Sequence, residues 1–343
     1  MIDQSEIAHY VDDLVASGQV TAAVAVVQKR DRRPISAVAG YLDPDECQSR
    51  ATVDAQFDLA SLTKVLSGTL AVVLDQSGDL GLDTPLAEIW AALDDRLATV
   101  TLEDLLRHRA GFRRWMPLYA VCDLPQEVAT RLLDGRWCDA PTPVYSDLDY
   151  LLWGLSVERA LRVSYTDLLS ARVLAALGVD EFSWSDAGER LWVGCLLPTG
   201  REVELADAVG LEVAEQPAPE RGRPQDGNCR FLGRPIGHAG LFGSARGLLA
   251  LAQSFLAPGD LLSAAAVERA LGGSDRFATG WFRRAETVAG AALGERAFGH
   301  EGFTGGSVWV DPEAELIAVL LAHRASLKVD LSEARARFHR LAL

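Results

Sequence analysis

Lysine is scarce in this 343-residue chain. The 33 basic residues comprise only three lysines, Lys29, Lys64 and Lys328, and 30 arginines. Acidic residues are more numerous, at 48, so the formal net charge is −15. Nucleic acids and anionic membrane surfaces are bound by basic patches, which this composition lacks. We therefore expect neither of them as a partner.

The sequence also lacks the cysteine spacing of a disulfide framework or a metal site, and it lacks long apolar runs. The five cysteines are odd in number and dispersed, with neither disulfide nor metal-ligand spacing: Cys47, Cys122, Cys138, Cys195 and Cys229. This usage is typical of a reducing compartment. No apolar run approaches the length of a membrane span, and the N-terminus lacks the basic start of a signal peptide. These features predict a cytoplasmic protein.

One segment combines a nucleophile with the rare lysine. Residues 57–64 (FDLASLTK) lead into the apolar run 65–74 (VLSGTLAVVL), which predicts a loop followed by a helix buried on all sides. Ser61 and Lys64 are three residues apart and therefore share one helix face. Burial should lower the pKa of Lys64, so that it serves as a general base for the Ser61 hydroxyl. The alternative is a helix-capping serine beside a lysine that reaches solvent.

The chemistry favours catalysis over that alternative. This chain uses arginine for almost every basic position, yet it places one of its three lysines at the head of the apolar helix. Arginine cannot accept a proton at ordinary pH, whereas lysine can. The choice of Lys64 therefore indicates a proton-transfer role.

Periodicity predicts the secondary structure along the chain. A helix is expected at 4–16, followed by two strands at 21–28 and 35–41. The middle is expected to be helical, with a capping box at Thr101. The helices expected there and beyond are 145–161, 165–177, 243–255, 262–271 and 331–341, and the later strands are 278–283, 307–310 and 316–323. Residues 197–237 are expected to be a long loop.

This order predicts a sheet assembled from both termini, with a helical part inserted between them. We expect one domain, 1–343, in which residues 1–57 and 232–343 form the sheet part and residues 58–231 are mostly helical. Ser61 would lie where the two parts meet, and ligand sites are common in such crevices.

Tyr145 precedes one of the middle helices. The prolines of the preceding PTPV segment restrict its approach, and Asp147 follows two residues later. A phenol held near Lys64 would relay protons between the nucleophile and a leaving group. The alternative is a loop tyrosine that only packs and hydrogen-bonds.

Two glycine-rich segments occur late in the chain. Residues 299–306 (GHEGFTGG) predict an edge-like strand whose backbone N–H groups approach a ligand, with His300 as a polar or cationic contact. The alternative there is a glycine-rich hairpin. Residues 237–244 (GHAGLFGS) predict a tight turn into a helix, with a structural role for His238.

Together these segments resemble the serine β-lactamase and penicillin-binding-protein superfamily, in its class C, carboxylesterase and D-aminopeptidase branch. That branch carries Ser-x-x-Lys, Tyr-x-Asn and Lys/His-x-Gly in this order. The corresponding pairs here are Ser61/Lys64, Tyr145/Asp147 and His300/Gly302, and LLRHRAGF and GHAGLFGSA also match. The resemblance covers nearly the whole chain. It implies an α+β fold (an α/β sandwich) of the β-lactamase/transpeptidase type, with an antiparallel sheet flanked by helices.

The resemblance also implies roles. Ser61 would be acylated, Lys64 and Tyr145 would move the protons, and the backbone N–H groups of Ser61 and Phe303 would form the oxyanion hole. No metal and no organic cofactor would be needed. Asp147, His300 and Gly302 would contact the substrate.

Two departures from the family pattern bear on specificity. Asp147 replaces an Asn. When ionised it accepts hydrogen bonds but donates none, so it could not donate to a substrate amide carbonyl, and it would repel a substrate carboxylate. His300 replaces a Lys and weakens a fixed positive charge. Both changes disfavour β-lactam hydrolysis and leave acyl transfer untouched.

The resulting hypothesis is a serine hydrolase acting through an acyl-enzyme on Ser61, with a small carboxylic ester as its substrate. One alternative is a D-amino-acid peptidase, an amidase or a weak β-lactamase. Another is an inactive homologue that acts as a binding protein. The loops at 112–140 and 197–237 are expected to shape the acyl pocket.

Overall fold

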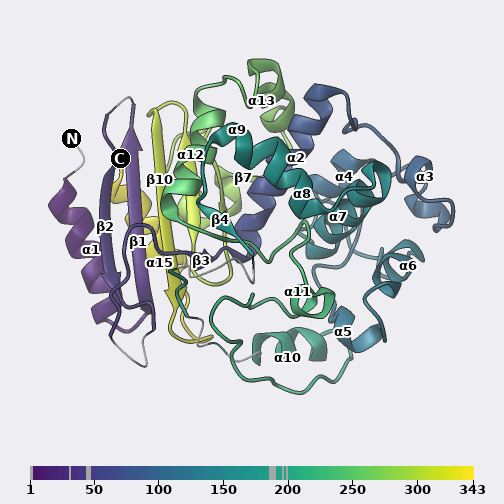
Figure 1. The fold of residues 1–343 in the computed structure, drawn as a ribbon, viewed down its shortest axis with the longest axis horizontal. Coiled ribbons are helices and arrows are strands. Elements are labelled where there is room, and N and C mark those ends of the chain that lie inside the picture. Colours follow the sequence, from purple (N-terminus) through teal and green to yellow (C-terminus); the bar gives the residue numbers. More distant parts are fainter. Residues whose placement is uncertain (1–2, 31, 44–47, 185–190, 195–196, 198–199) are drawn as a thin grey trace.

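A seven-stranded antiparallel sheet forms one side of the molecule in the computed structural model (Figure 1). The structure describes residues 3–30, 32–43, 48–184, 191–194, 197 and 200–343. The strand order is β2-β1-β10-β9-β8-β7-β6. The strands are β1 (Val20–Lys29), β2 (Ile35–Gly40), β6 (Phe277–Ala278), β7 (Trp281–Arg283), β8 (Phe298–Glu301), β9 (Ser307–Asp311) and β10 (Leu316–Arg324).

Strands from the two ends of the chain are neighbours in this sheet. Strand β1 pairs with β10 along its length, from Val20 opposite Arg324 to Lys29 opposite Leu316. Alternate residues of a strand point to opposite faces, and both faces of β1 are buried. A strand covered on both faces needs an almost continuous apolar sequence, which explains the TAAVAVV run. The prediction of one sheet from both termini is confirmed.

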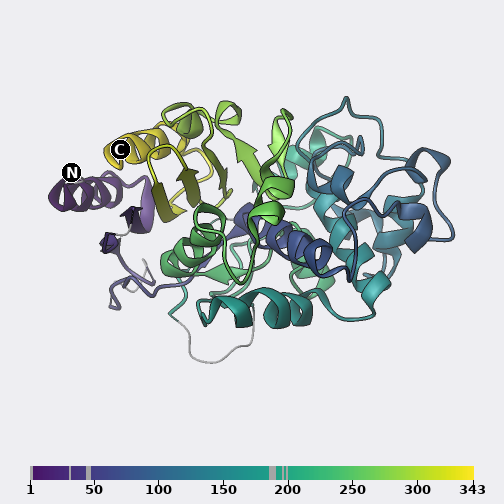
Figure 2. The same cartoon turned by 90° about the horizontal axis from the view of Figure 1, so that it is seen from above.

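Helices cover both faces of the sheet. The first helix, α1 (Gln4–Ala16), and the last, α15 (Ser332–Leu341), pack side by side on one face (Figure 2). Helix α12 (Ala245–Leu256) packs against β1 and β10 on the other face. The buried hydrophobic residues accordingly form two clusters. Ala23 and Ala25 belong to the smaller cluster, beneath α1, whereas Val24 and Val26 belong to the larger one.

The other side of the molecule is helical. Its helices are α2 (Thr63–Ser77), α3 (Leu86–Ile89), α4 (Leu102–Leu106), α5 (Leu118–Val121), α6 (Glu127–Leu133), α7 (Asp147–Leu161), α8 (Tyr165–Leu169) and α9 (Ala175–Leu177), with a π turn at Ser170–Leu174. The capping box predicted at Thr101 is present, because its side chain and that of Asp104 bond reciprocally to the backbone of α4.

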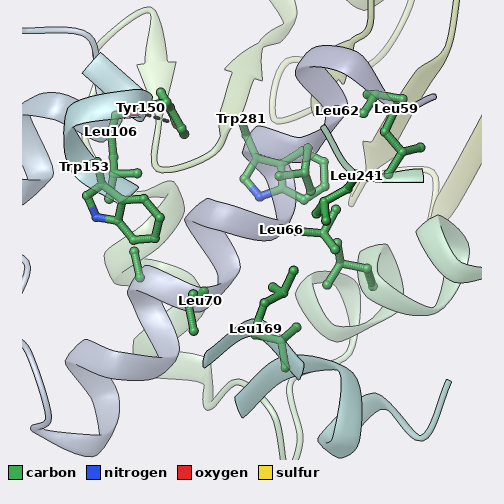
Figure 3. Packing of buried hydrophobic residues seen from close by; sticks show 14 of the residues in the cluster. Leu59, Leu62, Leu66, Leu70, Leu106, Tyr150, Trp153, Leu169, Leu241 and Trp281 are labelled. Atoms are coloured by element: carbon green, nitrogen blue, oxygen red, sulfur yellow. Dashed lines mark hydrogen bonds between the residues drawn. The ribbon is translucent and has the colours of Figure 1, made fainter. Parts of the chain in front are cut away.

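Helix α2 is the central element of the core. Every residue from Thr63 to Leu74 is buried. Figure 3 shows Leu66 of this helix near Leu241 and Trp281, which come from late segments of the chain. An apolar run without a polar face is stable only in such surroundings.

A small second sheet leads the chain into α2. Its order is β3-β5-β4, formed by β3 (Phe57–Asp58), β5 (Phe242–Gly243) and β4 (Phe182–Ser183). The remaining helices are α10 (Gly200–Asp207), α11 (Gly227–Leu232), α13 (Ala264–Leu271), α14 (Val288–Ala291), and three short 3₁₀ helices at Ala60–Leu62, Asp95–Leu97 and Arg284–Glu286.

Three sequence expectations were wrong in detail. Residues 197–237 contain the helices α10 and α11, which polar and glycine-rich flanks concealed. The strand expected at 278–283 is the hairpin β6–β7, because Gly280 takes a left-handed φ of 84° and turns the chain. The edge-like strand is β8, which lies inside the sheet between β7 and β9.

None of the helices in the described residues is long and apolar enough to cross a membrane.

Candidate active site

Ser61 sits on a strained turn between β3 and α2. The preceding residue, Ala60, has a φ of 46°, in the left-handed region that non-glycine residues rarely adopt. The Asp58 carboxylate stabilises this turn, because its Oδ1 accepts the Ala60 amide at 2.9 Å while its Oδ2 accepts the Gln225 amide at 2.6 Å. Strain of this kind often marks a functional site. The sequence analysis did not identify Asp58 or Ala60.

Lys64 lies one helical turn beyond Ser61 and is fully buried. Its Nζ donates to Ser61 Oγ at 3.0 Å, to Asp147 Oδ1 at 2.6 Å and to the His238 carbonyl at 3.1 Å. Three oxygen atoms thus accept hydrogen bonds from the ammonium group. The Ser-x-x-Lys pair is therefore in contact, as the spacing predicted.

The protonation of Lys64 differs from the sequence expectation. Burial by itself lowers the pKa of Lys64, but the adjacent Asp147 carboxylate and the Tyr145 phenol reverse that effect, and the net result is a raised pKa. The expectation of a lowered pKa was wrong. It considered desolvation alone and omitted the opposite charge that Asp147 supplies.

Tyr145 lies against the same lysine. The Nζ of Lys64 is 4.9 Å from the centre of the Tyr145 ring. Burial raises the pKa of the Tyr145 phenol, while the charge of Lys64 and hydrogen bonds from Lys64 and Ser61 oppose that rise. The structure thus brings together the three residues predicted to be catalytic.

A buried pair behind Tyr145 holds its ring in place. The ring centres of His108 and Tyr145 are 4.7 Å apart. His108 Nδ1 accepts the Ser146 amide at 3.1 Å and lies 3.2 Å from Asp149 Oδ2. Burial lowers the pKa of His108 and raises that of Asp149, so each group is shifted towards its neutral form. The sequence analysis did not identify Asp149.

His300 lies behind the site and carries no positive charge. Only 1% of its surface is exposed, and its ring stacks on Phe282 with the centres 4.0 Å apart. Burial, followed by the nearby charge of Lys64, lowers the pKa of His300 to about 3. Of the two contacts expected of His300, polar or cationic, the lowered pKa contradicts the cationic one, because a cation there would be desolvated beside another cation.

The Gly302–Phe303 segment passes close to the nucleophile. A side chain on Gly302 would place its Cβ 2.7 Å from the Leu59 carbonyl oxygen, so only glycine permits this approach. The Phe303 amide donates no hydrogen bond to any described residue, and both Phe303 and Ser61 line the same cavity. This arrangement leaves the Phe303 N–H available to an incoming oxygen.

The cavity beside Ser61 has a volume of about 500 Å³. It is lined by Ala60, Ser61, Arg114, Trp115, Tyr145, Asp147, Arg201, Glu202, Leu205, Gln225, Asp226, His238, Ala239 and Phe303. Seven of these residues belong to the segments 112–140 and 197–237, so both segments line the cavity beside Ser61, although Arg201, Glu202 and Leu205 do so from helix α10 and not from a loop. Their individual roles could not be predicted, because no local pattern places them together.

The charged groups of the cavity differ in how they are paired. Asp147 bonds to Lys64, Glu202 accepts the Tyr119 hydroxyl at 2.7 Å, and Asp226 contacts His238 at 3.0 Å. Arg114, by contrast, is exposed and forms no ion pair within the described part of the chain. The cavity therefore presents a positive charge at its mouth.

The fold and the site are those of a serine hydrolase with the β-lactamase/transpeptidase architecture. The model of the Beta-lactamase family matches residues 7–342, and the chain belongs to this family.

Individual relatives are more distant. The Putative fimbrial assembly protein FimD, serogroup D, of Dichelobacter nodosus is 30% identical over 135 residues, which cover 36% of this chain and 34% of the relative. The chain thus aligns with about a third of the length of the curated relatives that it matches.

Solved structures agree over almost the whole chain. SurE superposes with a TM-score of 0.74 at 22% identity, covering 99% of this chain and 76% of the other. EstCE1, described as a hydrolase with promiscuous acyltransferase activity, superposes with a TM-score of 0.72 at 18% identity, covering 99% and 98%. At these identities the likeness shows the shared fold.

Proposed function

We propose that this protein hydrolyses small carboxylic esters through an acyl-enzyme formed on Ser61. The observation that carries the proposal is the contact of Lys64 Nζ with Ser61 Oγ at 3.0 Å, at the wall of a cavity of about 500 Å³. A serine hydroxyl is a weak nucleophile until a neighbouring base removes its proton. The buried lysine and tyrosine are the groups placed to do so.

The reaction begins when the Lys64 ammonium group releases a proton to the solvent. The neutral amine then takes the Ser61 proton while Ser61 Oγ bonds to the ester carbonyl carbon. The backbone N–H groups of Ser61 and Phe303 stabilise the developing oxyanion. Tyr145 donates its proton to the departing alkoxide, and its phenolate is stabilised by Lys64. Water then hydrolyses the acyl-enzyme by the same proton transfers in reverse order.

Two features favour esters over β-lactams. The Asp147 carboxylate is engaged by Lys64 at 2.6 Å and has no proton to donate to a substrate amide. His300 is buried and neutral, so it offers no cation to a β-lactam carboxylate. An alkyl ester needs neither contact.

One observation supports a second class of substrate, which carries a carboxylate. Arg114 and Arg201 both line the cavity, and guanidinium groups bind carboxylates. D-amino-acid peptides and β-lactams carry such a group. A peptidase, amidase or weak β-lactamase activity would use the same Ser61, Lys64 and Tyr145. A binding protein without turnover is disfavoured, because the three proton-transfer residues remain in contact.

Covalent labelling tests the nucleophile. A fluorophosphonate probe should add one mass increment to the wild type and none to Ser61→Ala, and that variant should lose turnover of p-nitrophenyl acetate and butyrate. Ser77→Ala, at the exposed end of the same helix, is the matched control and should behave as wild type. Wild-type turnover by Ser61→Ala would exclude Ser61 as the nucleophile.

Substrate class is tested by comparing kcat/KM on esters, penicillins and D-alanyl peptides. Asp147→Asn and His300→Lys should raise the ratio of amide to ester turnover, by about one to two orders of magnitude for Asp147→Asn, since one restored hydrogen bond contributes roughly 1.5–3 kcal/mol. If the ratio of amide to ester turnover is unchanged in both variants and in the double variant, Asp147 and His300 do not set the substrate class. The acyl-enzyme mechanism would not be contradicted by that result.

A further inference from the structure

Three side chains with metal-binding atoms meet beside the cavity. They are Asp226 at the N-terminus of α11, Cys229 in its first turn, and His238 in the following turn. The Asp226 Oδ1 lies 3.0 Å from His238 Nε2, and Cys229 Sγ lies 3.8 Å from the same nitrogen. One ligand atom from each residue lies within 4.8 Å of the others. The acyl-enzyme chemistry uses none of these three side chains.

These separations are close to those of a tetrahedral zinc site. Zinc bonds of about 2.0–2.1 Å to nitrogen or oxygen and about 2.3 Å to sulfur place neighbouring ligand atoms about 3.4 Å (N to O) and about 3.6 Å (N to S) apart. The observed 3.0 and 3.8 Å differ from these values by a few tenths of an ångström. The third pair, Asp226 Oδ1 and Cys229 Sγ, lies within 4.8 Å, so coordination of all three atoms requires side-chain adjustments, the largest of them between these two residues.

The surroundings hold the histidine in the orientation that a metal requires. His238 Nδ1 lies 2.9 Å from the Ile236 carbonyl oxygen, which accepts its proton and leaves Nε2 facing Asp226 and Cys229. A ligating histidine commonly donates its other nitrogen to a carbonyl in this way. The turn itself is anchored to α2, because Ser67 Oγ donates to the Gly237 carbonyl at 2.6 Å.

Charge and access also suit a cation. Asp226 and His238 line the cavity, so an ion would reach them from there. The acidic side chains of Asp58 and Glu202 lie near Asp226, and the guanidinium group of Arg230 lies 3.9 Å from Glu202 and partly offsets their charge. Burial raises the pKa of the Cys229 thiol, so coordination would have to displace its proton.

We propose that Asp226, Cys229 and His238 bind one zinc ion per chain, with water from the cavity as the fourth ligand. A mixed oxygen, sulfur and nitrogen set suits zinc better than magnesium or calcium, which prefer oxygen alone. The backbone carbonyl of His238 also accepts a hydrogen bond from Lys64 Nζ at 3.1 Å. Bound zinc would therefore hold the turn that positions Lys64, without taking part in acyl transfer.

Cobalt substitution tests the site directly. Metal-depleted protein titrated with Co²⁺ should show the near-ultraviolet charge-transfer band of a thiolate–cobalt bond, saturating at one ion per chain and abolished by Zn²⁺. Cys229→Ser should lose the band, and Asp226→Asn, which keeps the α11 cap, should bind Co²⁺ at least about tenfold more weakly. Zn²⁺ should raise the melting temperature of the wild type more than that of either variant.

Cys122→Ser is the matched control, because Cys122 is also buried and free but lies outside the cluster. It should retain the band and the thermal shift. The proposal is overturned if wild-type protein shows no thiolate–cobalt band with excess Co²⁺. It is equally overturned if the band persists unchanged in Cys229→Ser. Neither result depends on hydrolytic activity, so the test is independent of the proposed function.

Discussion

Asp147 holds the Lys64 ammonium group at 2.6 Å, at the position where the family pattern has an asparagine. A neutral amide there would leave burial as the main influence on Lys64, whereas the carboxylate raises the pKa of Lys64 above its usual value. This contact ties the protonation of the candidate base to one substituted residue. The pH dependence of the enzyme should therefore depend on Asp147.

The first prediction concerns Asp147→Asn. Wild-type kcat/KM for p-nitrophenyl acetate should rise with pH into the alkaline range, because Lys64 must lose a proton before it can act as a base. Removing the carboxylate removes the main charge that raises the pKa of Lys64. The rising limb should move to lower pH by about one unit or more. Asp139→Asn, at an exposed ion pair with Arg113, is the control. Superimposable profiles for wild type and Asp147→Asn would contradict this account.

The second prediction concerns Lys64→Arg. Guanidinium keeps the positive charge but cannot accept the Ser61 proton. The kcat/KM of Lys64→Arg should fall nearly as far as that of Lys64→Ala. The fall should be much greater than tenfold, which corresponds to about 1.4 kcal/mol. Lys29→Arg is the matched control, because Lys29 is one of the other two lysines and bonds to the Leu343 carbonyl at the surface. A Lys64→Arg enzyme with more than about a tenth of wild-type kcat/KM would show that only the charge matters.

The third prediction concerns the cation at the mouth of the cavity. Arg114 lines the cavity and is exposed. Arg114→Gln should lower kcat/KM by about tenfold, or about 1.4 kcal/mol, for an ester bearing a free carboxylate such as p-nitrophenyl hemiglutarate. The neutral p-nitrophenyl butyrate should be hydrolysed as before. Arg136→Gln, whose arginine pairs with Asp134, should affect neither substrate. Equal losses on both esters would mean that Arg114 does not select for charge.

The fourth prediction concerns stability at mildly acidic pH. Burial lowers the pKa of His323 in β10 to about 4. The unfolded chain binds a proton near pH 6.5 and the folded chain does not, so stability is lost as the pH falls from about 6.5 towards about 4. Lowering the pH from about 7.5 to about 5.5 therefore reduces the free energy of unfolding by about 1 kcal/mol through His323 alone. Burial also lowers the pKa of His300 and of His339 to about 3, and both act in the same direction.

Urea unfolding at the two pH values measures this effect. Between the two pH values, the free energy of unfolding of His323→Leu should fall by about 1 kcal/mol less than that of the wild type. His9→Gln, at an exposed site, should match the wild type. Parallel losses in wild type and His323→Leu would show that His323 is not the group responsible.

Much of the fold was predictable because its signals are local. The continuous apolar runs of β1 and β10, the capping box of Thr101 and the unbroken apolar run of α2 each follow from a few adjacent residues. The contact of Ser61 with Lys64 is equally local, since one helical turn separates them. Helices α10 and α11 were missed because their segments are polar and rich in glycine and proline, which masks helical periodicity.

What only the tertiary structure decided is the chemistry of these groups. Sequence alone determined that a serine and a lysine share one face at the head of a buried helix. It did not determine the protonation of Lys64, because Asp147 is 83 positions away and the His238 carbonyl 174 positions away. The meeting of Asp226 and Cys229 with His238 likewise depends on how α11 and the next turn pack. A pKa and a ligand set depend on distances and burial, and those are established only when distant segments fold against one another.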